Sequence, residues 1–197
     1  MIRAAATSIL FLAALGGVAR ADEKLPLCYE YGCAVEAEIR YTGAELASIQ
    51  RLLAGTDNAA RERSRLALAV GLLYAWAGRQ SPISNDRGGD YADEGVVGRM
   101  DCIDHAQSTT RLLRMIETHG WLRFHKVLEP VRRTLYLVTQ HFSAAVEELT
   151  ATGGGTKAAA ADGQGGRFVI DSWFYDNGWP AVVLPLEDWK NGAGPDV

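Results

Sequence analysis

The spacing of apolar residues changes about half way along the chain, and this change constrains the fold more than any other feature. In residues 43–54, and again from Asp57 or Asn58 to about residue 78, apolar side chains recur every three or four positions. This spacing is typical of helices with one buried face. Four residues of the second helix are expected to pack in the core: Leu66, Val70, Leu73 and Ala77.

Beyond residue 120, short runs rich in β-branched and aromatic residues indicate strands. We expect them at residues 121–128, within 134–149, at 167–175 and at 181–186. Residues 153–166 are rich in Gly and Ala and have no periodicity, which is typical of a hairpin loop. Helices followed by antiparallel strands predict an α+β domain in which N-terminal helices pack on a small antiparallel sheet.

Residues 1–21 have the pattern of a signal peptide. Arg3 supplies the positive start, residues 9–18 are apolar, and Ala19-Arg20-Ala21 is a small-x-small cleavage site. The apolar run is short for a bilayer, so an uncleaved N-terminal anchor is the weaker alternative. We expect a periplasmic or secreted protein, without stable membrane insertion after cleavage. Its single domain would comprise a helical part, residues 22–80, and a core, residues 81–197.

The charge of the chain argues against nucleic acid as a partner. The formal net charge is −4 at pH 7, and no run of Lys and Arg occurs. Binding to nucleic acid needs a basic surface, which this composition does not favour.

Three cysteines occur, at Cys28, Cys33 and Cys102. In an oxidising compartment an odd number indicates one disulfide and one free thiol. Cys28 and Cys33 flank Gly32 and can close a small loop, which leaves Cys102 free. No second pair of cysteines follows to complete a structural zinc site.

Cys102 lies where a thiol can be activated. Residues 83–100 have the composition of a loop, and a loop of this length in a compact domain is often functional. The loop leads to Asp101, the expected N-cap of a helix over residues 103–119. The dipole at a helix N-terminus is expected to lower the pKa of the Cys102 thiol.

Attack of a thiolate on an acyl carbon also needs an imidazole that takes the proton and a group that orients the imidazole. His141, in a strand-like run, is the best candidate base. Asp171 stands in an apolar β-type run, where a carboxylate needs a partner to offset its desolvation. The sequence therefore predicts a catalytic triad of Cys102, His141 and Asp171.

Two alternatives remain open. His125, on the first expected strand, is the reserve base. A metal site built from Cys102, His105 and either Asp104 or His141 is the weaker idea, because the spacing is not that of a structural zinc site.

Three motifs occur in a fixed order: Asp101-Cys102-Ile103-Asp104-His105-Ala106, His141-Phe142-Ser143-Ala144-Ala145-Val146 and Val169-Ile170-Asp171. The order resembles that of the transglutaminase-like superfamily, particularly the bacterial transglutaminase-like cysteine proteinases. The resemblance covers about Arg99 to Trp173. It implies a papain/transglutaminase-like core in which Cys102 is the nucleophile, His141 the base and Asp171 the orienting carboxylate, with no metal or organic cofactor.

The same resemblance implies an exported thiol enzyme that acts on amide bonds through a thioester intermediate. Water as second substrate would give a peptidase or amidase, and an amine would give a transamidase; the sequence favours neither. The expected partner is a peptide or protein substrate, including a cell-wall-associated one. The alternative is a catalytically silent module of this fold that binds a peptide, a protein or a cell-wall partner.

Overall fold

The computed structural model describes residues 21–89, 93–136, 138–149 and 166–196. All of the expected signal peptide except Ala21, and all of the expected 153–166 loop except Gly166, lie outside these residues. No helix in the described part of the chain is long and apolar enough to cross a membrane.

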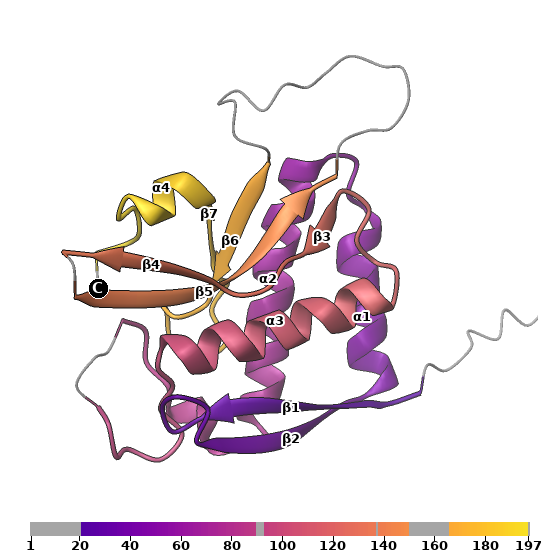
Figure 1. The fold of residues 1–197 in the computed structure, drawn as a ribbon. Helices are drawn as coiled ribbons and strands as arrows, with labels where there is room; N and C mark the ends of the chain where they lie inside the picture. Colours follow the sequence, from indigo (N-terminus) through magenta and orange to yellow (C-terminus); the bar gives the residue numbers. More distant parts are fainter. Residues whose placement is uncertain (1–20, 90–92, 137, 150–165, 197) are drawn as a thin grey trace, which may run out of the picture.

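The described residues form a strand hairpin, then a group of helices, then a run of strands and a short last helix (Figure 1). In chain order these are β1 (Glu23–Tyr29), β2 (Val35–Tyr41), α1 (Gly43–Ala54), α2 (Ala59–Gly78), the short 3-10 helix η1 (Pro82–Asn85), α3 (Cys102–Thr118), β3 (His125–Val127), β4 (Val131–Leu135), β5 (Thr139–Glu148), β6 (Arg167–Asp171), β7 (Val182–Pro185) and α4 (Leu186–Lys190).

The strands form two antiparallel sheets. β1 and β2 make a hairpin, and the larger sheet has the order β3-β5-β6-β7. β4 also pairs with β5 and continues the path of β3 after an interruption that contains Pro130. Proline lacks the N–H that a ladder needs, which accounts for a break at this position. The expected α+β class is confirmed.

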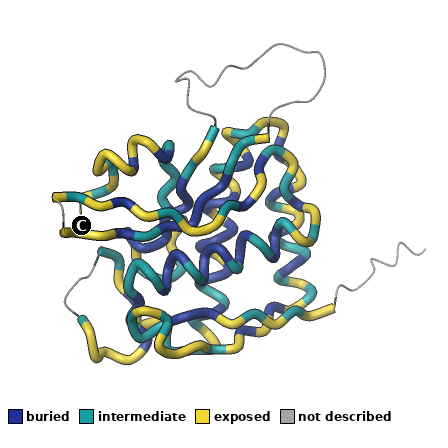
Figure 2. Tube along the Cα trace, in the orientation of Figure 1, coloured by how far each residue is buried: buried dark blue, intermediate teal, exposed yellow. Residues whose placement is uncertain are grey.

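The central element is α3, which contacts β1 on one side and β5 on the other (Figure 1). One cluster of buried apolar residues runs through the hairpin, the helices and the large sheet; it includes Leu27, Leu46, Leu73, Leu112 and Val146. Figure 2 shows buried positions along α3 and along the strands that face it. The helical part and the remainder of the chain therefore share one core.

Helix starts follow the local sequence closely. Thr42 and Glu45 form a reciprocal capping box at α1, and the Asn58 side chain accepts the Arg61 N–H at α2 over 2.9 Å. The expected helices at 43–54 and 58–78 are confirmed. The four stripe residues of α2 expected in the core are all buried.

Other expectations need correction. The hairpin β1–β2 was not expected, so helices do not simply precede strands, although Ala37, Ile39 and Tyr41 alternate with charged residues as strand residues do. α4 was also missed. The strands expected at 121–128 and 167–175 are shorter, at His125–Val127 and Arg167–Asp171, because turns occupy the remaining residues.

The expected disulfide between Cys28 and Cys33 is confirmed, and it closes the turn between β1 and β2. Four consecutive residues of this turn, from Glu30 to Cys33, have φ between 59° and 67°. Only Gly32 adopts this left-handed conformation without steric cost. Backbone N–H groups of the turn donate to carboxylates at the start of α3, with Tyr31 N on Asp104 Oδ2 at 2.8 Å. The turn is thereby fixed beside Cys102.

We expect replacement of both Cys28 and Cys33 by serine to lower the free energy of unfolding by about 2 kcal/mol, because the loop that the bond closes is short. Urea unfolding at pH 7 measures this change. Cys102→Ser, which keeps the disulfide, is the matched control and should change the free energy much less. Mass spectrometry of non-reduced peptides should find Cys102 as the free thiol; a disulfide to Cys102 as the main species would contradict both the pairing and a catalytic thiol.

Candidate active site

Cys102 is the first residue of α3, and its thiol is free and partly buried. The helix begins there because the Asp101 side chain accepts the N–H groups of Ile103 and Asp104 at 3.0 and 2.9 Å. Asp104 returns the interaction by accepting the Asp101 N–H at 3.2 Å. This capping box confirms the expected cap and leaves Cys102 in the first helical turn.

His141 and Asp171 meet on neighbouring strands, as their positions in the sequence predicted. His141 Nε2 lies 2.8 Å from Asp171 Oδ2, and both residues are buried, at 3% and 1% exposure. A carboxylate accepts, so Nε2 carries the proton of this hydrogen bond. The neutral ring then presents its lone pair at Nδ1, on the opposite edge.

Aromatic residues hold this pair in place. The Trp189 indole N–H donates to Asp171 Oδ2 at 2.9 Å, and the Trp173 backbone N–H donates to Asp171 Oδ1 at 3.2 Å. The His141 ring lies 4.8 Å from the Trp173 ring and 5.6 Å from those of Phe174 and Trp189, between centroids. The carboxylate therefore accepts three hydrogen bonds, counting that from His141. The imidazole is buried among aromatic rings, which limit its rotation.

The second ring nitrogen of His141 is unused. Nδ1 is buried and has no hydrogen-bond partner among the residues that the structure describes. Cys102 and His141 are thus not hydrogen-bonded in this resting arrangement. A buried polar atom without a hydrogen-bond partner costs free energy, so its presence needs an explanation. One explanation is that Nδ1 is kept free to accept a proton from a donor that reaches the site.

The expectation of a lowered thiol pKa is wrong for the resting state. Burial raises the pKa of Cys102 above its ordinary value of 9.0, and the charges of Asp101 and Asp171 raise it further. The backbone N–H of Phe142 lowers the pKa but does not reverse the shift. Desolvation and two nearby carboxylates outweigh the favourable position at the helix start.

The reserve base His125 is engaged elsewhere. Its Nδ1 lies 2.8 Å from Glu62 Oε1, and both side chains are fully buried. β3 lies near the C-terminal end of α3, where the Val127 N–H donates to Glu117 Oε1 at 2.7 Å. Cys102 is at the opposite end of this helix (Figure 1), so His125 is not placed to act as its base.

The metal-site alternative is also wrong for the part of the chain that the structure describes. The His105 ring turns away to Asp86 and Ser172, and Asp104 accepts backbone N–H groups. Within the described ranges, ligand atoms of Cys102, His105, Asp104 and His141 do not gather in one group.

Sequence reasoning missed a buried polar network behind the site. His105 Nε2 lies 3.0 Å from Asp86 Oδ2 and Nδ1 lies 2.8 Å from Ser172 Oγ, while Thr109 Oγ1 reaches the same Ser172 hydroxyl at 2.8 Å. Burial alone lowers the pKa of His105, but the Asp86 carboxylate outweighs it and raises the pKa above the ordinary value. The network ties the 83–100 loop and α3 to the residue that follows Asp171. The signal for this network in the sequence was His105, which we considered as a ligand in the metal-site alternative.

The loop before Cys102 packs closely on the chain after β6. A Cβ at Gly88 would lie 2.3 Å from the Tyr175 Cα, so only glycine fits there. The Gly89 N–H donates to the Trp173 carbonyl at 2.9 Å, and the Met100 N–H donates to Asp86 Oδ1 at 2.9 Å. The expected functional loop thus has at least a positioning role: it fixes the start of α3 against the segment that carries Asp171.

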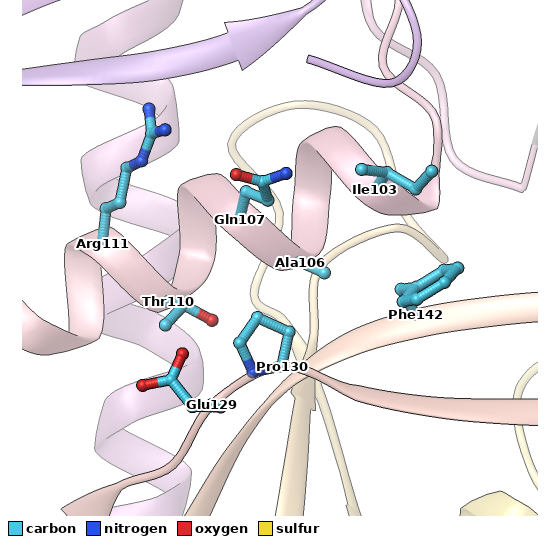
Figure 3. A pocket seen from close by; sticks show the side chains of 8 residues that line it. All are labelled: Ile103, Ala106, Gln107, Thr110, Arg111, Glu129, Pro130 and Phe142. Atoms are coloured by element: carbon cyan, nitrogen blue, oxygen red, sulfur yellow. The ribbon is translucent and has the colours of Figure 1, made fainter.

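A cavity of about 360 Å³ lies along α3, between this helix and residues Glu129, Pro130 and Phe142 (Figure 3). Four of its lining residues are apolar: Ile103, Ala106, Pro130 and Phe142. Ile103 and Phe142 are the chain neighbours of Cys102 and His141, but none of the three triad side chains lines the cavity itself.

The rest of the cavity wall is polar and comes from the next turns of α3 and from the segment before β4. These residues are Gln107, Thr110, Arg111 and Glu129. The site thus combines a thiol, a positioned imidazole–carboxylate pair and a mixed apolar and polar pocket, which is the set of parts that covalent acyl transfer needs. Comparisons of this chain with protein-family models, with curated proteins and with solved structures found no match.

Proposed function

We propose that this protein is an exported thiol enzyme with a papain/transglutaminase-like core, which acts on amide bonds of a peptide or protein. The observation that carries the proposal is the His141–Asp171 pair: Nε2 is bound to a fully engaged carboxylate at 2.8 Å, while Nδ1 is buried and has no partner in the described part of the chain. A purely structural histidine would more simply satisfy both nitrogens. The Phe142 backbone N–H lowers the pKa of the Cys102 thiol, which supports the proximity of the thiol to the residue that follows His141.

The reaction follows from these positions. The Cys102 thiol passes its proton to His141 Nδ1 as Sγ bonds to the substrate carbonyl carbon, and Asp171 stabilises the imidazolium that forms. His141 then gives this proton to the leaving amine, and the C–N bond breaks to leave a thioester on Cys102. Water, deprotonated by His141, cleaves the thioester to an acid; an amine would instead form a new amide.

The negative charge that develops on the substrate carbonyl oxygen needs hydrogen-bond donors to stabilise it. The backbone N–H of Cys102 lies in the first turn of α3, where N–H groups have no intrahelical acceptor. It is therefore suited to donate to the oxyanion, with the helix N-terminus adding a favourable field.

A trapped acyl-enzyme would test the proposal. After incubation with a library of periplasmic peptides and an acid quench, we expect intact-mass adducts on Cys102 that neutral hydroxylamine removes, as it does thioesters. Cys102→Ala should carry none. A primary amine added before the quench should yield amide products if the enzyme is a transamidase, and only free acids if it is a hydrolase.

The raised pKa of Cys102 and the missing Cys102–His141 hydrogen bond favour a second candidate, a silent module that binds a peptide, a protein or a cell-wall partner. The two candidates differ in thiol reactivity. A catalytic Cys102 reacts with iodoacetamide near neutral pH in a His141-dependent manner, whereas peptides that bind without adducts and a thiol that stays inert would support the module.

A further inference from the structure

We infer that the cavity beside Cys102 is the subsite for the acyl side of the substrate, and that it takes an uncharged, apolar residue next to the scissile bond. This inference rests on the proposed function and adds the substrate class to it. A volume of about 360 Å³ is at the small end of the range for ligand sites, which fits one or two residues of a peptide and not a long segment.

The part of the cavity next to the thiol is apolar. Ile103 and Phe142, the residues that follow Cys102 and His141 in the chain, form one end of the wall, and Ala106 and Pro130 continue it (Figure 3). A side chain that extends from an acyl group on Cys102 would meet these surfaces first. Burial of aliphatic area against them favours binding.

Two neutral polar groups further along the cavity are uncommitted. Gln107 and Thr110 are three residues apart on α3 and so share a face. The Thr110 hydroxyl is buried without a hydrogen-bond partner, and no partner for the Gln107 amide is present among the described residues. An amide and a hydroxyl donate and accept without net charge, which suits the main-chain amide of a bound peptide.

The charges at the cavity are already paired. Arg111 lies 2.7 Å from Glu36 and donates to the Pro26 carbonyl at 3.0 Å, and Glu129 lies 2.9 Å from Arg114. A charged substrate side chain would lose water without finding a free counter-charge, which is costly. Discrimination against charge is therefore built into the pocket.

The test compares three chloromethyl ketones, acetyl-Leu, acetyl-Asp and acetyl-Lys, on the purified full chain. Each alkylates Cys102 as Sγ forms a C–S bond and chloride leaves, so the chemistry is the same and only the side chain differs. Rates are divided by the iodoacetamide rate, because iodoacetamide is too small to need the cavity. We expect the leucine reagent to react at least about tenfold faster than both charged reagents, equal to about 1.4 kcal/mol.

Gln107→Glu places a carboxylate in the cavity and should raise the lysine-to-leucine ratio of rates about tenfold. Ser64→Glu, on the exposed face of α2, adds the same charge elsewhere and should leave the ratio unchanged. Similar rates for all three reagents, or a ratio unaltered by Gln107→Glu, would overturn the subsite while a His141-dependent thiol still upheld the proposed function. A thiol inert to every reagent, iodoacetamide included, would overturn both.

Discussion

Replacing His141 with alanine is expected to slow the acylation of Cys102 by p-nitrophenyl acetate at pH 7 by about a hundredfold, since general-base catalysis contributes on the order of 10² to 10⁴ in rate. The loss should be large because burial and the charges of Asp101 and Asp171 raise the pKa of Cys102, so that little thiolate exists without a base. Release of nitrophenolate in the first turnover measures the rate.

Asp171→Asn should have a smaller effect, about tenfold. An asparagine oxygen can still accept from His141 Nε2 and Trp189 Nε1, which both meet Asp171 Oδ2, although its NH₂ group would face the Trp173 N–H. His141 thus keeps a partner while the imidazolium loses its counter-charge. His119→Ala is the matched control, because His119 follows the far end of α3 and pairs with Glu23. Its rate should equal that of the wild type.

The pH dependence separates the base from the thiol. In His141→Ala the rate should follow the thiolate alone and climb with pH until it passes the raised pKa of Cys102, above 9.0. In the wild type, reaction should already be appreciable near neutral pH, because His141 can take the proton of the thiol. If the two profiles coincide, Cys102 is a structural cysteine and the binding-module function takes precedence.

The largest expected loss of stability follows from removing Glu62. Its carboxylate is fully buried and accepts from the Arg123 N–H at 2.8 Å, the Phe124 N–H at 3.0 Å and His125 Nδ1 at 2.8 Å. Glu62→Ala leaves these donors without an acceptor, and loss of one partner of a buried pair costs about 3–5 kcal/mol. Urea unfolding at pH 7 measures it, with Glu38→Ala as control; its ion pair with Lys24 is exposed and should contribute under about 1 kcal/mol.

Acid should weaken the interactions of the Glu62 carboxylate and so reveal their contribution to stability. Burial alone would raise the pKa of Glu62, but the bond from His125 and the two backbone N–H groups outweigh it and lower the pKa below 4.5. A carboxyl group whose pKa is lowered by folding stabilises the fold at pH values above its pKa in the unfolded chain. This stabilisation is lost as the pH falls through its pKa in the folded state. We expect wild-type stability to fall below pH 4.5, and Glu62→Gln to lack this component. An identical acid profile in the two proteins would contradict the assignment.

The fold was predictable where the signals were local. Apolar spacing and capping residues identified α1, α2 and α3, because a helix start depends on side chains within one turn, as with Asp101 and Asp104. Strand limits were less accurate. Pairing with distant partners, and breaks such as that at Pro130, decide where a ladder ends, and these contacts lie outside any short window of sequence.

By itself, the sequence determined the disulfide Cys28–Cys33, the free Cys102 at a helix start and the meeting of His141 with Asp171. The disulfide and the helix start depend on residue type and short-range pattern, whereas the pairing of His141 with Asp171 was expected from the need of a buried carboxylate for a partner and from the order of the three motifs. Only the tertiary structure decided how Trp189 holds Asp171. It also decided the raised pKa of the thiol, because a pKa depends on burial and on charges that packing brings near, whatever their separation in the chain.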